Sequence, residues 1–238
     1  MNLTDRNIWI TGASSGIGKQ AAKEFARVGC TVAVSSRRHS MLELINRELV
    51  PENLKVHVVA CNAASSSNVM QTFNKIVSAI GEIDCLINNA GITSFKLAEE
   101  NSVQEIKEII EVNLLGAIYC IKAAIPQMIK RNKGTIINIL SVAAEQRFPG
   151  SSAYAASKAG LLAYTDVLRE EVRKYKIRII NILPGATRTS MWPQEILEKH
   201  GDKMMAPEEI ARLLVSVYLQ NKLLVPEKII IKPLGGDI

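Results

Sequence analysis

Tyr154 and Lys158, in the segment YAASK, are residues whose types and spacing suggest catalysis. Two side chains four positions apart on an α-helix lie on the same face, one turn from each other. A tyrosine hydroxyl with a lysine ammonium beside it is a candidate proton donor. The same spacing recurs in YLQNK, where Tyr218 precedes Lys222 by four positions. Spacing alone therefore does not show which pair, if either, acts on a substrate.

A glycine-rich segment, TGASSGIG, follows the first apolar run of the chain. Its glycines are Gly12, Gly16 and Gly18, at the point where a predicted strand turns into a predicted helix. Glycine permits a tight turn and lets backbone N–H groups approach a pyrophosphate at the N-terminal end of the helix. At the first strand–helix junction of a chain in which strands and helices alternate, this segment predicts a nucleotide site.

The residues at the end of the second predicted strand bear on which nucleotide binds. An acidic residue at this place would accept hydrogen bonds from the ribose 2′-hydroxyl of NAD. Here the sequence reads Ser35, Ser36, Arg37 and Arg38. With no carboxylate to repel a 2′-phosphate and two guanidinium groups able to bind one, the segment favours NADP(H) over NAD(H).

The elements that must position these residues follow from the apolar pattern. Strands are predicted at 7–11, 31–36, 54–60, 83–89, 134–141, 177–184 and 228–232. Helices are predicted at 16–28, 39–49, 68–80, 103–131, about 153–175, and from near 207. The strand segments are almost continuously apolar, which is typical of parallel strands covered on both faces.

This alternation predicts an α/β fold of Rossmann type, a doubly wound parallel sheet of about seven strands with helices on both faces. No low-complexity linker divides the chain, so we expect a single domain over residues 1–238. The segment of about 188–206, between the sixth strand and the last helix, is expected to be a substrate loop.

The net charge of +6 raises the question of nucleic-acid or membrane binding. The basic residues are spread along the chain, and the densest segment, RKYKIR at 173–178, contains only one aromatic residue. This pattern predicts a solvated helix end and no nucleic-acid partner.

The cysteines and histidines give no sign of a disulfide framework or a metal site. Cys30, Cys61, Cys85 and Cys120 each lie in an apolar stretch and form no C-x-x-C pair, which predicts buried free thiols. The histidines have no metal-ligand spacing, so no metal is expected. The N-terminus does not read as a signal peptide, and no uninterrupted apolar stretch approaches membrane-spanning length, so we expect a cytoplasmic protein without a membrane partner.

The order of the motifs resembles the short-chain dehydrogenase/reductase family, and the match covers most of the chain. TGASSGIG is similar to that family's cofactor loop, and NNAG at 88–91 to the motif that ends its fourth strand. The further matches, in family order, are Asn113 in EVNLLG, Ser141 in INILS, Tyr154, Lys158, and the pair Pro184 and Gly185. Each motif is weak alone, but the ordered set is specific.

The resemblance implies four catalytic residues for transfer of a hydride between a nicotinamide and a carbonyl carbon. Tyr154 would be the proton donor, and Lys158 would lower its pKa and hold the nicotinamide ribose. Ser141 would hydrogen-bond the substrate carbonyl. Asn113 would hold a water that links Lys158 to solvent.

The resemblance also assigns cofactor contacts, with Tyr154 and Lys158 among them. Asn62 stands where the family usually has an aspartate that contacts the adenine, and an amide can still hydrogen-bond there. The full set of expected cofactor residues is Gly12, Ser14, Ser15, Gly16, Ile17, Gly18, Ser36, Arg37, Arg38, Asn62, Asn89, Ala90, Gly91, Tyr154, Lys158, Pro184, Gly185, Thr187 and Thr189.

Three functions follow as hypotheses. The first is NADPH-dependent, reversible reduction of a ketone or aldehyde to an alcohol. The second is reduction of a 3-oxoacyl thioester of an acyl-carrier protein or coenzyme A, in which the basic segment 173–178 would receive an acidic carrier. The third is a non-catalytic NADP(H)-binding sensor, against which the presence of both Tyr154 and Lys158 argues.

The substrate half of the site and the assembly state are expected from the same resemblance. Its lining is predicted to be apolar and to come from Ala143, Phe148, Gly150, GITSF at 91–95, MWPQEI at 191–196, Met204 and Met205. Members of this family usually form dimers or tetramers, so the resemblance implies a homodimer or homotetramer that associates partly through the helices carrying Asn113 and Tyr154. The C-terminal segment VPEKIIIKPLGGDI departs from the ending VDGG of many members, so the resemblance does not select a subfamily.

Overall fold

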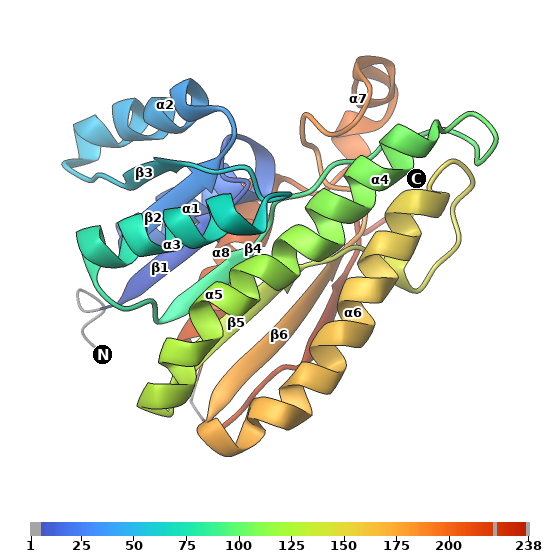
Figure 1. Cartoon of the computed structure of the whole chain (residues 1–238). Helices are drawn as coiled ribbons and strands as arrows, with labels where there is room; N and C mark the ends of the chain where they lie inside the picture. The colour runs from blue at the N-terminus through green and yellow to red at the C-terminus, as the bar shows by residue number, and fades with distance from the viewer. Residues whose placement is uncertain (1–5, 221–222, 237–238) are drawn as a thin grey trace.

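The computed structural model describes residues 6–220 and 223–236, and its centre is one parallel sheet in the order β3-β2-β1-β4-β5-β6-β7 (Figure 1). The strands are β1 (Asn7–Thr11), β2 (Thr31–Ser36), β3 (His57–Ala60), β4 (Cys85–Asn88), β5 (Gly134–Ile139), β6 (Ile177–Pro184) and β7 (Lys228–Ile231). The direction of strand order reverses between β1 and β4, which opens a crevice at the carboxyl ends of the strands. The predicted Rossmann-type sheet is confirmed.

Helices cover both faces of the sheet. One face carries α1 (Gly16–Arg27), α2 (His39–Leu49) and α8 (Pro207–Leu219), and the other carries α3 (Ser66–Ile80), α5 (Gly116–Arg131) and α6 (Ser152–Val172). The shorter elements are α4 (Val103–Ile110), α7 (Gln194–His200), and the turns η1 (Val50–Glu52), η2 (Glu111–Leu115), η3 (Val142–Ala144), η4 (Arg173–Tyr175) and η5 (Gly201–Lys203).

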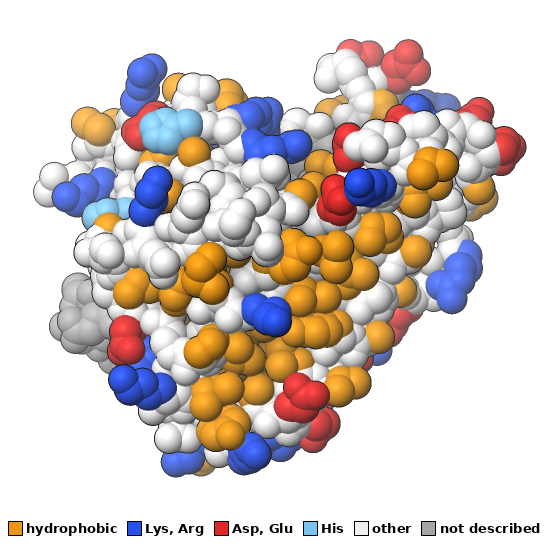
Figure 2. Space-filling view, viewed as in Figure 1, with side chains coloured by type: hydrophobic (Ala, Val, Ile, Leu, Met, Phe, Trp, Pro, Cys, Tyr) orange, Lys and Arg blue, Asp and Glu red, His pale blue; other side chains and the backbone are white. Residues whose placement is uncertain are grey.

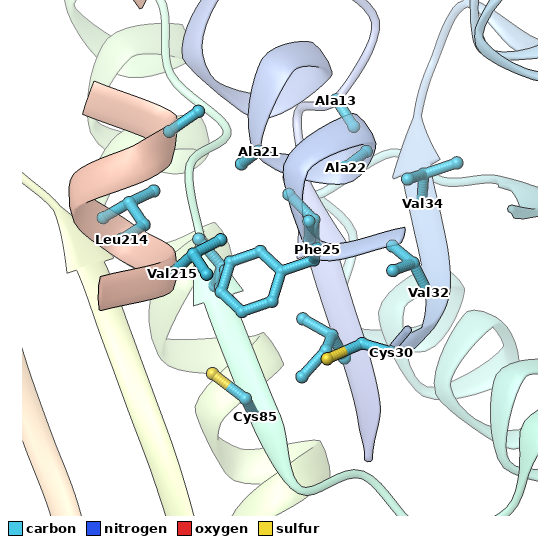
Figure 3. Packing of buried hydrophobic residues seen from close by; sticks show 14 of the residues in the cluster. Ala13, Ala21, Ala22, Phe25, Cys30, Val32, Val34, Cys85, Leu214 and Val215 are labelled. Atoms are coloured by element: carbon cyan, nitrogen blue, oxygen red, sulfur yellow. The ribbon is translucent and has the colours of Figure 1, made fainter. Parts of the chain in front are cut away.

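Phe25 shows how the first face is packed. It projects from α1 between Val215 of α8 and the strands, and its ring meets the Tyr218 ring edge-on at a centroid distance of 5.7 Å (Figure 3). Burying a side chain of this size contributes roughly 1.5–3 kcal/mol. Tyr218 is thus a core residue, and its sequence partner Lys222 lies outside the described residues.

The predicted helix over 103–131 is interrupted. A π-helical turn, η2, separates α4 from α5 and contains Asn113, whose side chain is fully buried. The span Val103–Arg131 is long and apolar enough by composition to cross a membrane, with a mean hydropathy of 1.6 in its most apolar window. In the described part of the chain, α4 and α5 within this span pack against α3, α6 and the sheet.

One sequence prediction about a surface segment needs correction. The segment 188–206 is not all loop, because it contains α7 and η5. In the basic segment 173–178, Arg173, Lys174 and Lys176 are exposed, as expected of a solvated helix end, and Arg178 is half-buried. Arg173 pairs with Glu170 and Glu227, and Arg178 donates hydrogen bonds to Thr135 Oγ1 and to the Tyr218 carbonyl.

The four cysteines are buried and free, as predicted. Burial raises the pKa of each thiol, and it is the dominant cause for all four. Thiols in this state are poor nucleophiles and pack as small apolar side chains.

Candidate active site

A cavity of about 860 Å³ lies at the carboxyl ends of the strands, around the reversal in strand order. One end is formed by the turn after β1 and the end of β2. The other end is formed by the segments after β4, β5 and β6. This is the place at which doubly wound sheets bind their ligands. A cavity of this volume is large enough for a cofactor and a small substrate together.

The turn after β1 has the conformation that a phosphate loop needs. Gly12 and Gly16 have positive φ values of 65° and 55°, which side chains rarely adopt. A Cβ on Gly12 would lie 2.5 Å from Ala90 Cα, so glycine is required there by space as well. Asn89 stabilises the turn, because its Nδ2 donates to the carbonyls of Thr11 and Gly12 at 3.1 and 3.0 Å.

The end of β2 places positive charge beside this turn. Arg38 donates hydrogen bonds to Ser14 Oγ at 2.9 Å and Ser15 Oγ at 3.4 Å. Arg37 is exposed, and its side chain has no hydrogen-bond partner in the described part of the chain. Ser35, by contrast, is buried and accepts a hydrogen bond from Trp9 Nε1 at 2.9 Å, so it has a structural role.

Ser141, Tyr154 and Lys158 meet at the other end of the cavity. Ser141 follows β5, and the first turns of α6 carry Tyr154 and Lys158. The Ser141 hydroxyl accepts from the Ala143 N–H at 3.1 Å and lies close enough to the Tyr154 hydroxyl to lower its pKa. Lys158 Nζ donates to the Ile139 carbonyl at 2.8 Å and lies 5.6 Å from the centre of the Tyr154 ring. The predicted constellation is thus assembled from two separate elements.

The expected lowering of the tyrosine pKa is not seen. Burial raises the pKa of Tyr154 to about 12, and the nearby Ser141 hydroxyl offsets this only in part. Burial also lowers the pKa of Lys158 to about 8. Both shifts have one cause, because a site of low polarity disfavours the phenolate and the ammonium alike.

Asn113 lies behind the cavity wall, where the π-helical turn holds it. Its Oδ1 accepts from the Ile92 N–H at 2.8 Å, and its Nδ2 donates to the Ile92 carbonyl and to Ser157 Oγ at 2.9 and 3.0 Å. A Cβ on Gly91 would stand between it and the lysine, 3.4 Å from Asn113 Oδ1 and 3.5 Å from Lys158 Nζ. Both polar groups therefore face the same small space beside Gly91. Turns of this kind in helices occur frequently at functional sites.

Most of the residues predicted for the site line this one cavity. Gly18 and Asn113 do not form its wall. Gly18 is a packing position instead, since a Cβ there would collide with Asn89 Nδ2. The cavity wall also contains residues that the sequence motifs did not predict, namely Thr11, Ser35, Cys61, Ala63, Val112, Ile139, Leu140, Val142, Pro149, Ser151, Ala186 and Ser190. Thr11 could have been predicted, because it is the first residue of the glycine-rich segment TGASSGIG. Its Oγ1 accepts from the N–H groups of Asn89 and Ala90.

The lining of the substrate half is smaller than predicted. Met191 and Trp192 line the cavity, but Met204 and Met205 do not, and neither do Ser94, Gly150 and residues 193–196. Met205 is turned away by a bridge to Thr187, in which the Arg188 N–H donates to the Met205 carbonyl at 2.9 Å. Thr189, in the same segment, stays at the wall and lies against the phosphate loop.

Comparison with known proteins decides the family, because the model of the short chain dehydrogenase family matches residues 6–199. The chain belongs to the short-chain dehydrogenases. It is 34% identical to the sepiapterin reductase of Chlorobaculum tepidum over 236 residues, which is 96% of each chain. It is 32% identical to a 3-oxoacyl-[acyl-carrier-protein] reductase of Thermotoga maritima over 224 residues, covering 90% of this chain and 91% of that one.

A solved structure supports the same assignment. An alcohol dehydrogenase of the archaeon Thermococcus sibiricus, complexed with 5-hydroxy-NADP, superposes with a TM-score of 0.87 at 27% identity, covering 96% of this chain and 97% of that one. As a short-chain dehydrogenase the protein is an oxidoreductase that uses a nicotinamide cofactor. The glycine turn fits such a group, because Gly12 and Gly16 line the cavity and their positive φ values form the tight turn that leads into the N-terminus of α1.

Proposed function

We propose that the protein reduces a ketone or aldehyde to an alcohol with NADPH, and oxidises the alcohol in the reverse direction. The observation that carries this proposal is that Ser141, Tyr154 and Lys158 share the wall of the cavity that the glycine turn also forms, with Lys158 Nζ 5.6 Å from the centre of the Tyr154 ring. The bound nicotinamide supplies the hydride. The chain must then orient the carbonyl and supply one proton.

Each residue of the group has a distinct task in this reaction. The Ser141 hydroxyl binds the carbonyl oxygen and orients it. The Tyr154 hydroxyl gives its proton to that oxygen as negative charge develops on it. Lys158 lies beside Tyr154 and would stabilise the phenolate that forms. Asn113 and Lys158 face each other beside Gly91, and a water between them would pass a proton back toward Tyr154.

The same cavity lets us test the function directly. NADPH oxidation across a panel of ketones, aldehydes and 3-oxoacyl thioesters is expected to show turnover with free carbonyl compounds. Faster turnover of a thioester would favour the rival function. The rival is supported by the relative from Thermotoga maritima, but Arg173 is already paired with Glu170 and Glu227, which leaves less free charge for an acidic carrier. Tight NADPH binding with no turnover of any compound would favour the non-catalytic sensor.

A preference for NADPH over NADH is part of the proposal. Arg37 and Arg38 flank the phosphate loop at the end of β2, and the described residues at the cavity include no carboxylate near them. The archaeal dehydrogenase of similar structure binds an NADP derivative. A guanidinium on a 2′-phosphate is worth about 1.5–3 kcal/mol.

Arg37→Ala is expected to raise the Kd of NADPH about tenfold and to leave that of NADH unchanged, because only NADPH carries the 2′-phosphate. Equilibrium titration of cofactor fluorescence measures both constants. Arg47→Ala is the matched control, since Arg47 is an exposed arginine on α2 away from the cavity. Equal Kd values for NADPH and NADH in the wild-type protein would sink the assignment.

We also propose that the protein self-associates through the face of α5 and α6. Figure 2 shows apolar side chains gathered over these helices, and Val167 of α6 is among the large apolar residues left exposed. An exposed apolar surface of this kind is typical of an interface between subunits. Sedimentation equilibrium distinguishes monomer, dimer and tetramer.

A further inference from the structure

Phe95 and Trp192 close the substrate half of the cavity with an aromatic contact that bridges two loops. Phe95 lies in the segment after β4, and Trp192 lies in the segment after β6. Their rings are stacked, with centroids 4.8 Å apart and planes inclined by 26°. Both residues line the cavity, so the stacked pair forms a continuous aromatic wall.

The protein holds both rings of this wall in place. Trp192 Nε1 donates to the Thr187 carbonyl at 3.0 Å, which fixes the plane of the indole. Phe95 has a φ of 52°, a left-handed conformation that is unfavourable for a bulky side chain. Strain of this kind persists only where the surrounding structure enforces it, and it is concentrated at ligand sites. The backbone at Phe95 is therefore bent in the conformation that brings its ring onto Trp192.

The wall leaves apolar surface uncovered at the mouth of the cavity. Phe95 is 38% exposed and its neighbour in the wall, Met191, is 39% exposed, although both are large apolar side chains. Phe148 lines the cavity as well. A flat ring that enters beside Ser141 and Tyr154 would cover these surfaces and find aromatic faces to stack on.

The charges around the cavity exclude one large class of carbonyl compound. Among the described residues, those that line it include no aspartate or glutamate, and its only cationic side chains are Arg37, Arg38 and Lys158. The two arginines lie at the nucleotide end, and Lys158 already donates to the Ile139 carbonyl. An anionic group placed against the aromatic wall would lose part of its hydration and gain no free cationic partner, which is costly.

We propose that the Phe95–Trp192 wall selects a neutral carbonyl compound that carries a flat aromatic or unsaturated ring, in preference to open-chain and anionic carbonyl compounds. This inference rests on the proposed reductase function and names the substrate class of that site. The carbonyl lies at Ser141 and Tyr154, and the ring stacks on the wall.

The test compares two matched pairs of substrates. The pair 4-phenylbutan-2-one and decan-2-one has equal numbers of carbon atoms and differs in the ring. The pair methyl 4-acetylbenzoate and 4-acetylbenzoate differs in the charge. With NADPH, kcat/KM is expected to be about tenfold higher for the ring ketone and for the ester, the size of one aromatic contact or more.

Variants of the wall then assign the selectivity to it. Trp192→Leu and Phe95→Leu should each reduce the preference for the ring ketone to about twofold or less, and Trp192→Phe, which keeps an aromatic face, should retain most of it. Leu97→Ala is the control, because Leu97 is an exposed apolar residue on the same loop outside the cavity wall. A preference that survives Trp192→Leu and Phe95→Leu overturns the inference, as does a wild-type protein that prefers decan-2-one or 4-acetylbenzoate.

A binding measurement separates this inference from the proposed function. Calorimetric titration of the same four compounds into Tyr154→Phe protein saturated with NADPH gives their Kd values without turnover. If the wild-type protein reduces none of them, the reductase function fails for these compounds. The wall is then still judged by whether the ring ketone and the ester bind more tightly than their partners, and equal Kd values overturn it.

Discussion

Tyr154→Phe is expected to lower kcat for carbonyl reduction by about a thousandfold while leaving the Kd of NADPH within about twofold of wild type. The substitution removes one oxygen atom, and that oxygen carries the proton which the reaction needs. General acid catalysis by a positioned side chain contributes about 10²–10⁴-fold. The phosphate loop, Arg37 and Arg38 are untouched, so cofactor binding should be retained.

The pH dependence gives this prediction a second readout. Reduction needs the protonated hydroxyl of Tyr154, which is present throughout the neutral range because burial raises its pKa to about 12. Oxidation needs the Tyr154 phenolate beside a protonated Lys158. In this state Tyr154 and Lys158 together hold one proton fewer than in the state that carries out reduction. The pair loses its first proton near pH 8, where the pKa of Lys158 lies. Alcohol oxidation should therefore rise about tenfold per pH unit below pH 8 and level off above it.

Two further variants guard this interpretation. Ser141→Ala removes the hydroxyl beside that of Tyr154 and should lower kcat by about a hundredfold, in the range of a lost oxyanion contact. Tyr218→Phe is the matched control, because it removes the same oxygen from a tyrosine that packs on Phe25 in the core. A rate for Tyr154→Phe equal to that of wild type would refute the role of Tyr154 as proton donor.

The fold was accessible from the sequence because its signals are local. Continuous apolar runs such as GTIINI mark strands covered on both faces, and glycines mark the turn between β1 and α1. The π-helical turn at Asn113 has no such signal, since the apolar pattern runs through 103–131 without a break. The short helix α7 was missed for a related reason, because Pro193 and the flanking polar residues read as loop.

The sequence predicts which residues belong to the candidate site, but it does not predict their burial or their pKa values. The order of motifs located Ser141, Tyr154 and Lys158, but the direction of the tyrosine pKa depends on how deeply the pair is buried, which spacing does not report. Contacts between distant loops are equally invisible. Nothing in the residues around Phe95 indicates that its ring stacks on Trp192.

Three asparagines, Asn88, Asn138 and Asn181, form a hydrogen-bonded ladder across β4, β5 and β6. They are paired in register, and each is almost or fully buried. Asn88 Nδ2 donates to Asn138 Oδ1 at 3.0 Å, and Asn138 Nδ2 donates to Asn181 Oδ1 at 3.0 Å. Asn181 Nδ2 in turn donates to Asp166 Oδ1 of α6 at 3.3 Å. The ladder therefore ties the sheet to the helix that carries Tyr154.

The ladder also has consequences for the site. Asn88 immediately precedes Asn89, and Asn138 lies three residues before Ser141. A shift of one residue in either pairing would turn an asparagine side chain to the opposite face of the sheet, away from its hydrogen-bond partner in the ladder. The register of the strands, and with it the position of Ser141 relative to the phosphate loop, is thereby fixed by buried amides.

Asn138→Ala is expected to lower the free energy of unfolding by about 3 kcal/mol. The substitution leaves the Asn88 amide without its acceptor, which costs about 1–3 kcal/mol, and it opens a cavity in the sheet. Urea denaturation followed by circular dichroism measures the change. In a chain of this size it corresponds to a fall in Tm of roughly 6–12 °C.

Asn138→Leu separates the two contributions, because leucine has the same number and branching of side-chain heavy atoms as asparagine and makes none of the hydrogen bonds. If the amide ladder is the main source of the stability, Asn138→Leu should be nearly as unstable as Asn138→Ala. Gln104→Ala is the control for an exposed amide, since its bond to Glu108 lies on the surface of α4 and should be worth less than about 0.5 kcal/mol. An Asn138→Leu variant as stable as wild type would show that packing, and not the ladder, holds β4, β5 and β6 in register.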